Sequence, residues 1–147
     1  MPEKQRRRFA VRTIQRALRL AYGDSFDVTA GITLPLSNRD APQPDITVLS
    51  VSVDALRQRE ETAADVELLV EVVVSRLDLA LQKRGIYAAA GVPTYWIVDV
   101  NRRSILVHSQ PAGAGYSFVE EYLTGQIPVH GVLLSVEALL PPADMSD

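Results

Sequence analysis

The stretch Leu68-Leu69-Val70-Glu71-Val72-Val73-Val74 decides the fold, because every position in it but one is apolar. A continuous apolar run of this length predicts a short strand covered on both faces, inside an α/β or α+β sheet. The exception is Glu71, and a buried carboxylate is costly unless a cation, a metal or hydrogen bonds compensate its charge. Glu71 therefore either lies at a strand end near water or has a binding partner.

The segments around this strand predict one α+β domain over residues 1–147. An apolar stripe with arginines opposite it predicts a first helix. A second helix is expected to begin at Ser75 or Asp78 as its N-cap and to end at the stop signal of Gly91 and Pro93. A polar excursion over 52–66 and a loop over 37–44 separate the first strands. The predicted helices cover 5–22 and 77–90, and the predicted strands of this part cover 26–34, 46–51, 68–74 and 94–100.

The remaining residues predict a β-rich C-terminal extension. A Pro/Gly loop over 110–115 separates two of its strands, and Ser135 is expected to cap a closing helical turn. The predicted strands of the extension cover 104–108, 116–122 and 129–133, and the helical turn covers 136–140.

The composition excludes several kinds of site. The chain of 147 residues has no cysteine and two histidines, which excludes disulfides, thiolate metal sites and cysteine nucleophiles and leaves too few ligands for a His-rich zinc site. Carboxylates and water would have to hold any metal, a donor set that favours Mg²⁺ or Mn²⁺. No apolar run approaches the ~20 residues of a membrane span, and no apolar signal-peptide core follows the basic N-terminus. We therefore expect a cytoplasmic protein without a membrane partner.

Six arginines crowd the first predicted helix, although the net charge of the chain is −3. A local basic patch on an acidic protein can meet a polyanion, and it can equally be a solvated helix face. Both interpretations stay open at this point. The arginines are Arg6, Arg7, Arg8, Arg12, Arg16 and Arg19.

A lysine stands in an unusual place on the second predicted helix. Helical spacing puts Lys83 and Gln82 on the face with Leu79, Ile86 and Tyr87, which we expect to pack on the sheet. A lysine there needs an anionic partner or an aqueous cleft.

The preceding strand supplies such a partner in Glu71, and Asp45, at the start of another strand, could supply a second carboxylate. Two carboxylates and a lysine at a sheet edge would form a divalent-cation site. The alternatives are a structural Glu71, a Lys83 that extends its amine to solvent, and a turn role for Asp45.

Several motifs resemble one known family. They are Pro44-Asp45, Leu69-Val70-Glu71-Val72, Lys83, Tyr87 and, above all, Ala90-Gly91-Val92-Pro93-Thr94-Tyr95-Trp96-Ile97-Val98-Asp99. Over about residues 9–140 the chain resembles the Uma2 (DUF820) family, a group with the PD-(D/E)XK restriction endonuclease-like fold. The resemblance implies an αβββαβ core, in which helices flank a mixed β-sheet. It also implies a metal-dependent DNA endonuclease of a bacterial cytoplasm.

The resemblance also implies roles for individual residues. Asp45 and Glu71 match the acidic metal ligands, to which the Val72 carbonyl is added, with Mg²⁺ or Mn²⁺ as cofactor. The third motif position holds Val73, and Lys83 on the following helix matches the displaced catalytic lysine. Possible accessory residues are Gln82, Asp78 and Tyr87.

Two kinds of partner follow from the same reading. Arg8, Arg12 and Arg16 on the first helix are expected to contact the DNA backbone. Nucleases of this fold often act as dimers, so a homodimer is expected to form through the β-rich extension. Its exposed aromatic residues would be Tyr116, Phe118 and Tyr122.

The alternative is a catalytically degenerate module that binds DNA or protein without cleaving. It rests on two departures from the family pattern. The chain starts almost at the first helix, and the helix aspartate that often precedes the lysine is replaced by Leu79 and Ala80.

Overall fold

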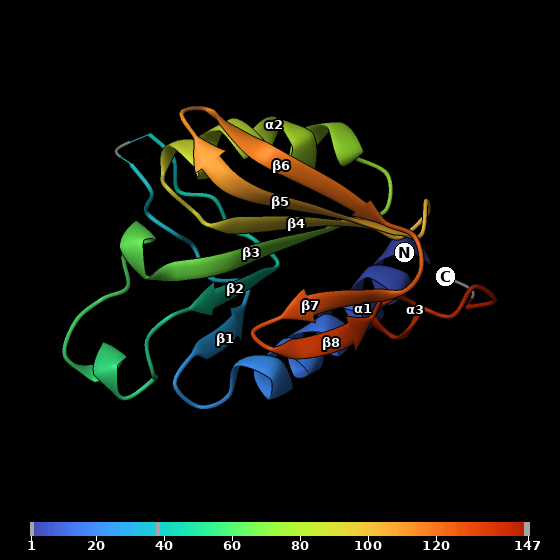
Figure 1. Cartoon of the computed structure of the whole chain (residues 1–147), viewed down its shortest axis with the longest axis horizontal. Coiled ribbons are helices and arrows are strands. Elements are labelled where there is room, and N and C mark those ends of the chain that lie inside the picture. The colour runs from blue at the N-terminus through green and yellow to red at the C-terminus, as the bar shows by residue number, and fades with distance from the viewer. Residues whose placement is uncertain (1, 38, 146–147) are drawn as a thin grey trace.

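A computed structural model describes residues 2–37 and 39–145 and arranges them in three layers (Figure 1). The middle layer is a six-stranded sheet in the order β1-β2-β3-β4-β5-β6. One face of the sheet carries α1, a β7–β8 hairpin and α3, whereas α2 covers the other face. The predicted α+β class and the order αβββαβ are therefore confirmed.

The helices are α1 (Pro2–Tyr22), α2 (Leu77–Ala89) and α3 (Val136–Leu139), and short 3₁₀ turns cover Ala55–Arg57 and Ala63–Asp65. The strands are β1 (Asp27–Ala30), β2 (Ile46–Leu49), β3 (Val66–Val73), β4 (Thr94–Asp99), β5 (Ser104–Ala112), β6 (Gly115–Tyr122), β7 (Gln126–Val129) and β8 (Val132–Ser135).

Strand β3 lies in the interior of the sheet, antiparallel to β2 and parallel to β4. Its side chains alternate between the two apolar cores: Val70 and Val72 join the core beneath α1, and Leu69 joins the core beneath α2. Both faces are covered, which explains the continuous apolar run. The alternation puts Glu71 on the side of α2.

Helix α1 packs on the sheet through Ala10, Ile14 and Leu18, which are fully buried at a spacing of four residues. Its arginine side is exposed, as the stripe predicts. Among the described residues, no helix is both long and apolar enough to cross a membrane.

The predicted face of α2 is confirmed only in part, because Tyr87 is fully buried and Ile86 packs on the core, but two other members of that face do not. The buried side chains are Ala80, Tyr87 and Ala88, whereas Leu79 and Gln82 are exposed. Small alanines let the helix lie close to the sheet on this side, and Leu81 packs against the same core in place of Leu79. Lys83 consequently lies at the rim of the contact and not within it.

The N-cap of α2 also differs from the prediction. Arg76 occupies the cap position, and no side chain caps the helix. Asp78 instead accepts hydrogen bonds from the Arg76 guanidinium, at 3.1 and 3.0 Å. Ser75 is exposed and precedes the cap position.

The first two strands are shorter than predicted. Strand β1 ends at Ala30 because Gly31 adopts a positive φ of 68°, which breaks the extended backbone. Strand β2 ends at Leu49, where its pairing with β3 shifts register. Between β1 and β2, an irregular segment begins at Gly31, and Asn38 within it lies outside the described residues.

The C-terminal extension contains more strand than predicted. Strand β5 continues to Ala112, through part of the expected loop, because it pairs there with β6 at Pro111–Tyr116 and Ala112–Gly115. Its pairing with β4 stops at Ser109, which lies opposite Thr94, the first residue of β4. Pro111, which lacks an N–H, is tolerated there without the loss of a hydrogen bond to β4.

A hairpin replaces the expected last strand over 129–133, because His130 and Gly131 both have positive φ and turn the chain. The predicted cap of the closing helix is confirmed, since Ser135 Oγ accepts a hydrogen bond from the Ala138 amide.

Candidate functional site

The site begins where the β2–β3 ladder stops. The register pairs Ile46 with Val70, so an extended ladder would pair Asp45 with Glu71 and then Pro44 with Val72. Pro44 has no N–H to donate to the Val72 carbonyl, and the ladder stops before it, so neither this carbonyl nor the Val72 amide has a backbone partner on that side. The Asp45 carboxylate replaces the missing strand, because its Oδ2 accepts a hydrogen bond from the Val72 amide at 2.6 Å.

Glu71 and Lys83 meet across the sheet–helix interface. Lys83 Nζ donates to Glu71 Oε2 at 2.7 Å, from the second turn of α2 to the last part of β3. The Glu71 side chain is 10% exposed and that of Lys83 is 34% exposed, so the pair lies at the rim of the protein interior. The predicted anionic partner of Lys83 is therefore Glu71.

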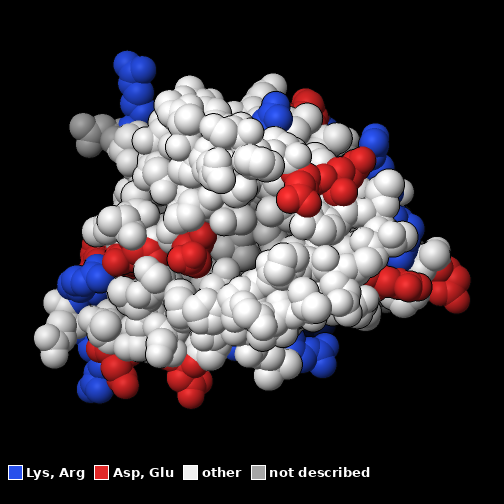
Figure 2. All heavy atoms as spheres, viewed as in Figure 1, with Lys and Arg blue, Asp and Glu red and all other residues white. Residues whose placement is uncertain are grey.

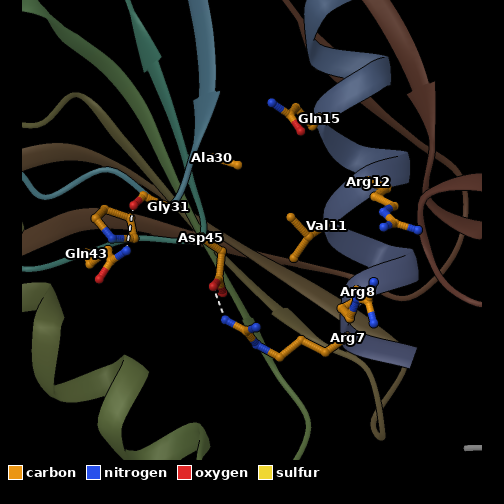
Figure 3. A pocket seen from close by; sticks show the side chains of 10 residues that line it. Arg7, Arg8, Val11, Arg12, Gln15, Ala30, Gly31, Gln43 and Asp45 are labelled. Carbon is orange, nitrogen blue, oxygen red and sulfur yellow. Dashed lines mark hydrogen bonds and ion pairs between the residues drawn. The ribbon is translucent and has the colours of Figure 1, made fainter. Parts of the chain in front are cut away.

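Arg7 completes this arrangement from the opposite face of the sheet. It lies on the second turn of α1, and its guanidinium forms an ion pair with Asp45 Oδ1 (Figure 3). Its Nε also donates to the Val72 carbonyl at 3.2 Å. It can reach both groups because β2 begins only at Ile46. Asp45 thus has a cation on one oxygen and a backbone amide on the other.

The electrostatics of the site centre on Glu71. Burial raises the pKa of this carboxyl, the Lys83 ammonium opposes that increase, and the nearby Asp45 charge adds to it. Burial, and then the charges of Glu71 and Asp45, raise the pKa of the Tyr87 phenol. Tyr87 thus stays protonated and packs edge-to-face on Tyr95, with ring centroids 4.8 Å apart.

The donor atoms at this point fit a hard divalent cation. Asp45 and Glu71 supply carboxylates, and the Val72 carbonyl belongs to the residue directly after Glu71. All three are oxygen donors of the kind that Mg²⁺ prefers. Glu71 Oε1 is buried and has no hydrogen-bond partner among the described residues. No group of three or more His, Cys, Asp or Glu residues that could hold a metal occurs in the described part of the chain. Backbone and water oxygens would therefore have to supply the other positions.

Within the described residues, the three possible accessory residues form no hydrogen bond or ion pair with Asp45, Glu71 or Lys83. Gln82 is exposed and does not share the face that packs on the sheet. Asp78 is exposed and ion-paired with Arg76 at 3.0 Å. Tyr87 is fully buried beneath the site, in agreement with a packing role.

Two hollows adjoin the site, one on each side of Arg7. One, of about 280 Å³, includes Glu71, Val72 and Lys83 in its lining. The other, of about 610 Å³, lies between α1 and the segment before β2, and its lining includes Arg8, Arg12 and Asp45 (Figure 3). Arg7 belongs to the walls of both hollows.

The exposed arginines of α1 continue from this second hollow. Arg8, Arg12 and Arg16 recur every four residues and form no hydrogen bond or ion pair within the described part of the protein. A further hollow of about 530 Å³ runs along the same three side chains. By contrast, the face seen in Figure 2 carries Asp and Glu side chains within a mostly uncharged surface and has most of its lysines and arginines at its margins.

Arg7 is the residue that sequence reasoning missed. In the sequence it is one of six arginines within fourteen residues, and nothing in that pattern separates it from its neighbours. The available signal was Pro44, because a proline that ends a ladder leaves backbone groups open at the next strand.

Comparison with known proteins agrees with this architecture. Residues 3–143 match the model of the Uma2 family, described as "Putative restriction endonuclease". A solved structure described as "a putative nuclease belonging to DUF820 from Anabaena variabilis" is 12% identical in sequence, with a TM-score of 0.69. That likeness covers 91% of this chain and 79% of the other and concerns the fold. No curated protein matches.

The family match spans nearly all the residues that form the three layers and the carboxylate–lysine arrangement. It includes every residue of the site, from Arg7 on α1 to Lys83 on α2. The chain belongs to the Uma2 family.

Proposed function

We propose that this protein is a DNA endonuclease that hydrolyses phosphodiester bonds with the help of Mg²⁺ or Mn²⁺. The observation that carries the proposal is the 2.7 Å contact between Lys83 and Glu71 beside the Asp45 carboxylate. A lysine and two carboxylates that meet where β2 begins and β3 ends are costly to bury and poorly suited to a purely structural role. The family description supports the same activity.

Asp45, Glu71 and the Val72 carbonyl are the groups that would hold the metal. A bound divalent ion would activate water and stabilise the charge on the phosphoryl oxygens. The Val72 amide fixes Asp45 Oδ2, so the carboxylate is held in place by the backbone of the strand that carries Glu71. Glu71 and Val72 therefore lie on β3, and Asp45, in the bend just before β2, is tied to that strand.

Lys83 would act through its remaining ammonium protons. One N–H is donated to Glu71 Oε2, and the side chain is about one-third exposed toward the 280 Å³ hollow. An ammonium in this position can orient an attacking water or donate to a phosphate oxygen, where negative charge develops. Its contact with Glu71 holds the otherwise flexible side chain at the site.

The arginine row of α1 would bind the DNA backbone. Arg8, Arg12 and Arg16 are exposed on one side of the helix that carries Arg7 at its start. Successive members of the row are about 6 Å apart along the helix axis. Such contacts depend on salt and carry no sequence information by themselves.

Nicking of supercoiled plasmid with Mg²⁺ or Mn²⁺ tests this function. We expect cleavage by the wild type and its loss in Glu71→Ala and Lys83→Ala. Glu120→Ala and Arg84→Ala are matched controls, since the first removes an exposed carboxylate on β6 and the second an exposed cation on α2. Cleavage that survives both site substitutions would exclude the assigned site.

A second candidate is the nuclease-fold module that binds DNA without cleaving. It is favoured by one observation: Arg7 and Lys83 already supply a cation to each carboxylate. DNA binding by the arginine row without cleavage, in the absence of any measurable affinity for Mn²⁺, would support this candidate.

We also propose a homodimer formed through the edge strand β6. Its support is the exposure of Phe118 and Val119 on an edge strand of eight residues, where backbone groups are open to another chain. Tyr116 is not one of the exposed aromatic residues that could contact a second copy. It is half-buried, and its hydroxyl donates to the Val92 carbonyl at 2.9 Å.

A further inference from the structure

Arg7 is bonded to the same groups that the proposed function assigns to the metal. Its guanidinium pairs with Asp45 Oδ1, and its Nε donates to the Val72 carbonyl at 3.2 Å. The N–H donors of the guanidinium thus point at two oxygen donors that a divalent cation would need. A guanidinium and a divalent ion cannot both occupy these oxygens, because the charges repel each other and the positions overlap.

The contacts of Arg7 with these groups can be replaced by contacts with another cation. Its side chain is 45% exposed, and an ion pair that is open to water contributes little to stability. Glu71 Oε1, in contrast, is buried and has no hydrogen-bond partner within the described residues. A divalent cation could therefore bind Glu71 Oε1, which Arg7 does not contact, and replace Arg7 at Asp45.

A neighbouring hollow can accommodate the released guanidinium. Arg7 forms part of the wall of the 610 Å³ hollow, which Arg8 and Arg12 also line (Figure 3). It also separates this hollow from the one beside Lys83. Withdrawal of Arg7 from Asp45 would join the two hollows into one cleft, with three arginines on one side and Lys83 on the other.

We propose that Arg7 is a displaceable counter-ion of the site. It competes with the divalent cation for Asp45 and the Val72 carbonyl, and the cation frees its guanidinium to bind a phosphate of the substrate beside Arg8 and Arg12. This inference rests on the proposed function. It adds that the resting protein carries its own cation at the metal position.

Binding of Mn²⁺, followed by the electron paramagnetic resonance signal of the free ion, tests the competition without reference to activity. The proteins are the wild type, Arg7→Gln and the matched control Arg8→Gln. The control removes the same charge from the next residue, whose side chain does not contact Asp45. Arg7→Gln is expected to bind Mn²⁺ roughly 5- to 10-fold more tightly than the wild type. Arg8→Gln is expected to change the affinity less than about 2-fold, as an exposed charge screened by salt should.

The displacement itself can be observed by NMR of the arginine Nε–H groups during titration with diamagnetic Mg²⁺. Arg19 is an internal control on the same helix, because its Nε donates to the Val28 carbonyl at 3.2 Å, the distance found for Arg7. The Arg7 resonance is expected to shift or broaden as Mg²⁺ saturates the site. The Arg19 resonance is expected to stay in place.

The outcomes separate the inference from the function on which it rests. Equal Mn²⁺ affinities for Arg7→Gln and Arg8→Gln, weaker binding by Arg7→Gln, or an unchanged Arg7 resonance at saturating Mg²⁺ would overturn the inference and leave the metal site intact. Failure of all three proteins to bind Mn²⁺ would overturn the metal site, the proposed cleavage and the inference together. Circular dichroism of each variant verifies that the fold is retained.

Discussion

The Asp45 carboxylate takes the place of a missing strand residue, because it accepts the Val72 amide proton at 2.6 Å where Pro44 cannot continue the ladder. The same carboxylate is paired with Arg7 through its other oxygen. Asp45 therefore has a structural contact and a proposed ligand function on two separate atoms.

These two roles can be separated by substitution. Asp45→Asn keeps a carbonyl oxygen that can accept the Val72 amide, so we expect it to cost less than about 1 kcal/mol of unfolding free energy. Asp45→Ala leaves that amide without an acceptor and should cost about 1–3 kcal/mol. Urea denaturation measures both values. Both variants should lose cleavage, and a fully active Asp45→Asn would show that the charge is not needed.

Removal of the Lys83 ammonium should leave the Glu71 carboxylate buried without its cation. We expect Lys83→Met to lower the unfolding free energy at pH 7 by about 2 kcal/mol, less than the full cost of breaking a buried pair because Lys83 is partly exposed. The double variant Glu71→Gln with Lys83→Met should recover most of this loss. A double-mutant cycle by urea denaturation measures the coupling, and additive effects would argue against an energetic link between the two side chains.

The pair Arg59–Asp65 should give an acid-dependent contribution to stability far from the site. Two guanidinium hydrogen bonds of 2.8 Å and the Thr62 amide lower the pKa of Asp65 to about 2. A pKa lowered by folding contributes stability above the ordinary value of 3.8, and this contribution is lost as the pH falls toward about 2.

Asp65→Asn should therefore cost about 1 kcal/mol at pH 5 and clearly less at pH 2.5, a magnitude reduced by the exposure of Arg59. Urea denaturation at both pH values measures the difference. The control is Asp54→Asn, since Asp54 is exposed and its ion pair with Arg57 is long, at 3.9 Å. An Asp65→Asn effect that is equal at both pH values would contradict the linkage.

The arginine row should determine the salt dependence of DNA binding. The double variant Arg12→Gln with Arg16→Gln should weaken binding to any duplex sequence and reduce the slope of log K against log salt by about 2, near 0.9 for each phosphate contact. Fluorescence anisotropy at several salt concentrations measures the slope. Arg57→Gln, an exposed arginine outside α1, should leave it unchanged.

A charge on the β6 edge should prevent the proposed dimer. Phe118→Glu places a carboxylate on the exposed edge strand, where it should oppose pairing with a second copy. Light scattering coupled to size exclusion should then give a dimer mass for the wild type and a monomer mass for the variant. Leu20→Glu, an exposed apolar residue on α1, is the control. A monomeric wild type would exclude the dimer.

The sequence predicts the core of this fold well, because its strongest signals are local. The apolar run of β3 and the stop signals after α2 each depend on neighbours along the chain. The Glu71–Lys83 contact belongs to the same class, since β3 and α2 are consecutive elements.

Features that depend on distant contacts could not be read in this way. The buried face of α2 is set by how closely Ala80 and Ala88 let it approach the sheet, and Pro111 fits a strand because no residue of β4 lies opposite it. Arg7 is a third case. Its partners come from β3 and from the segment before β2, 65 and 38 residues away.

Helix α1 packs against both the six-stranded sheet and the β7–β8 hairpin with α3, and this has a consequence for the order in which the molecule is built. Its buried residues share one core with Ile127, Val129 and Val136, so the hairpin and α3 brace the helix against the sheet (Figure 1). During translation, Asp45, Glu71 and Lys83 all leave the ribosome before this brace exists. We therefore expect the placement of Arg7 beside the carboxylates to depend on the hairpin and α3, which follow all the residues of the site in the chain.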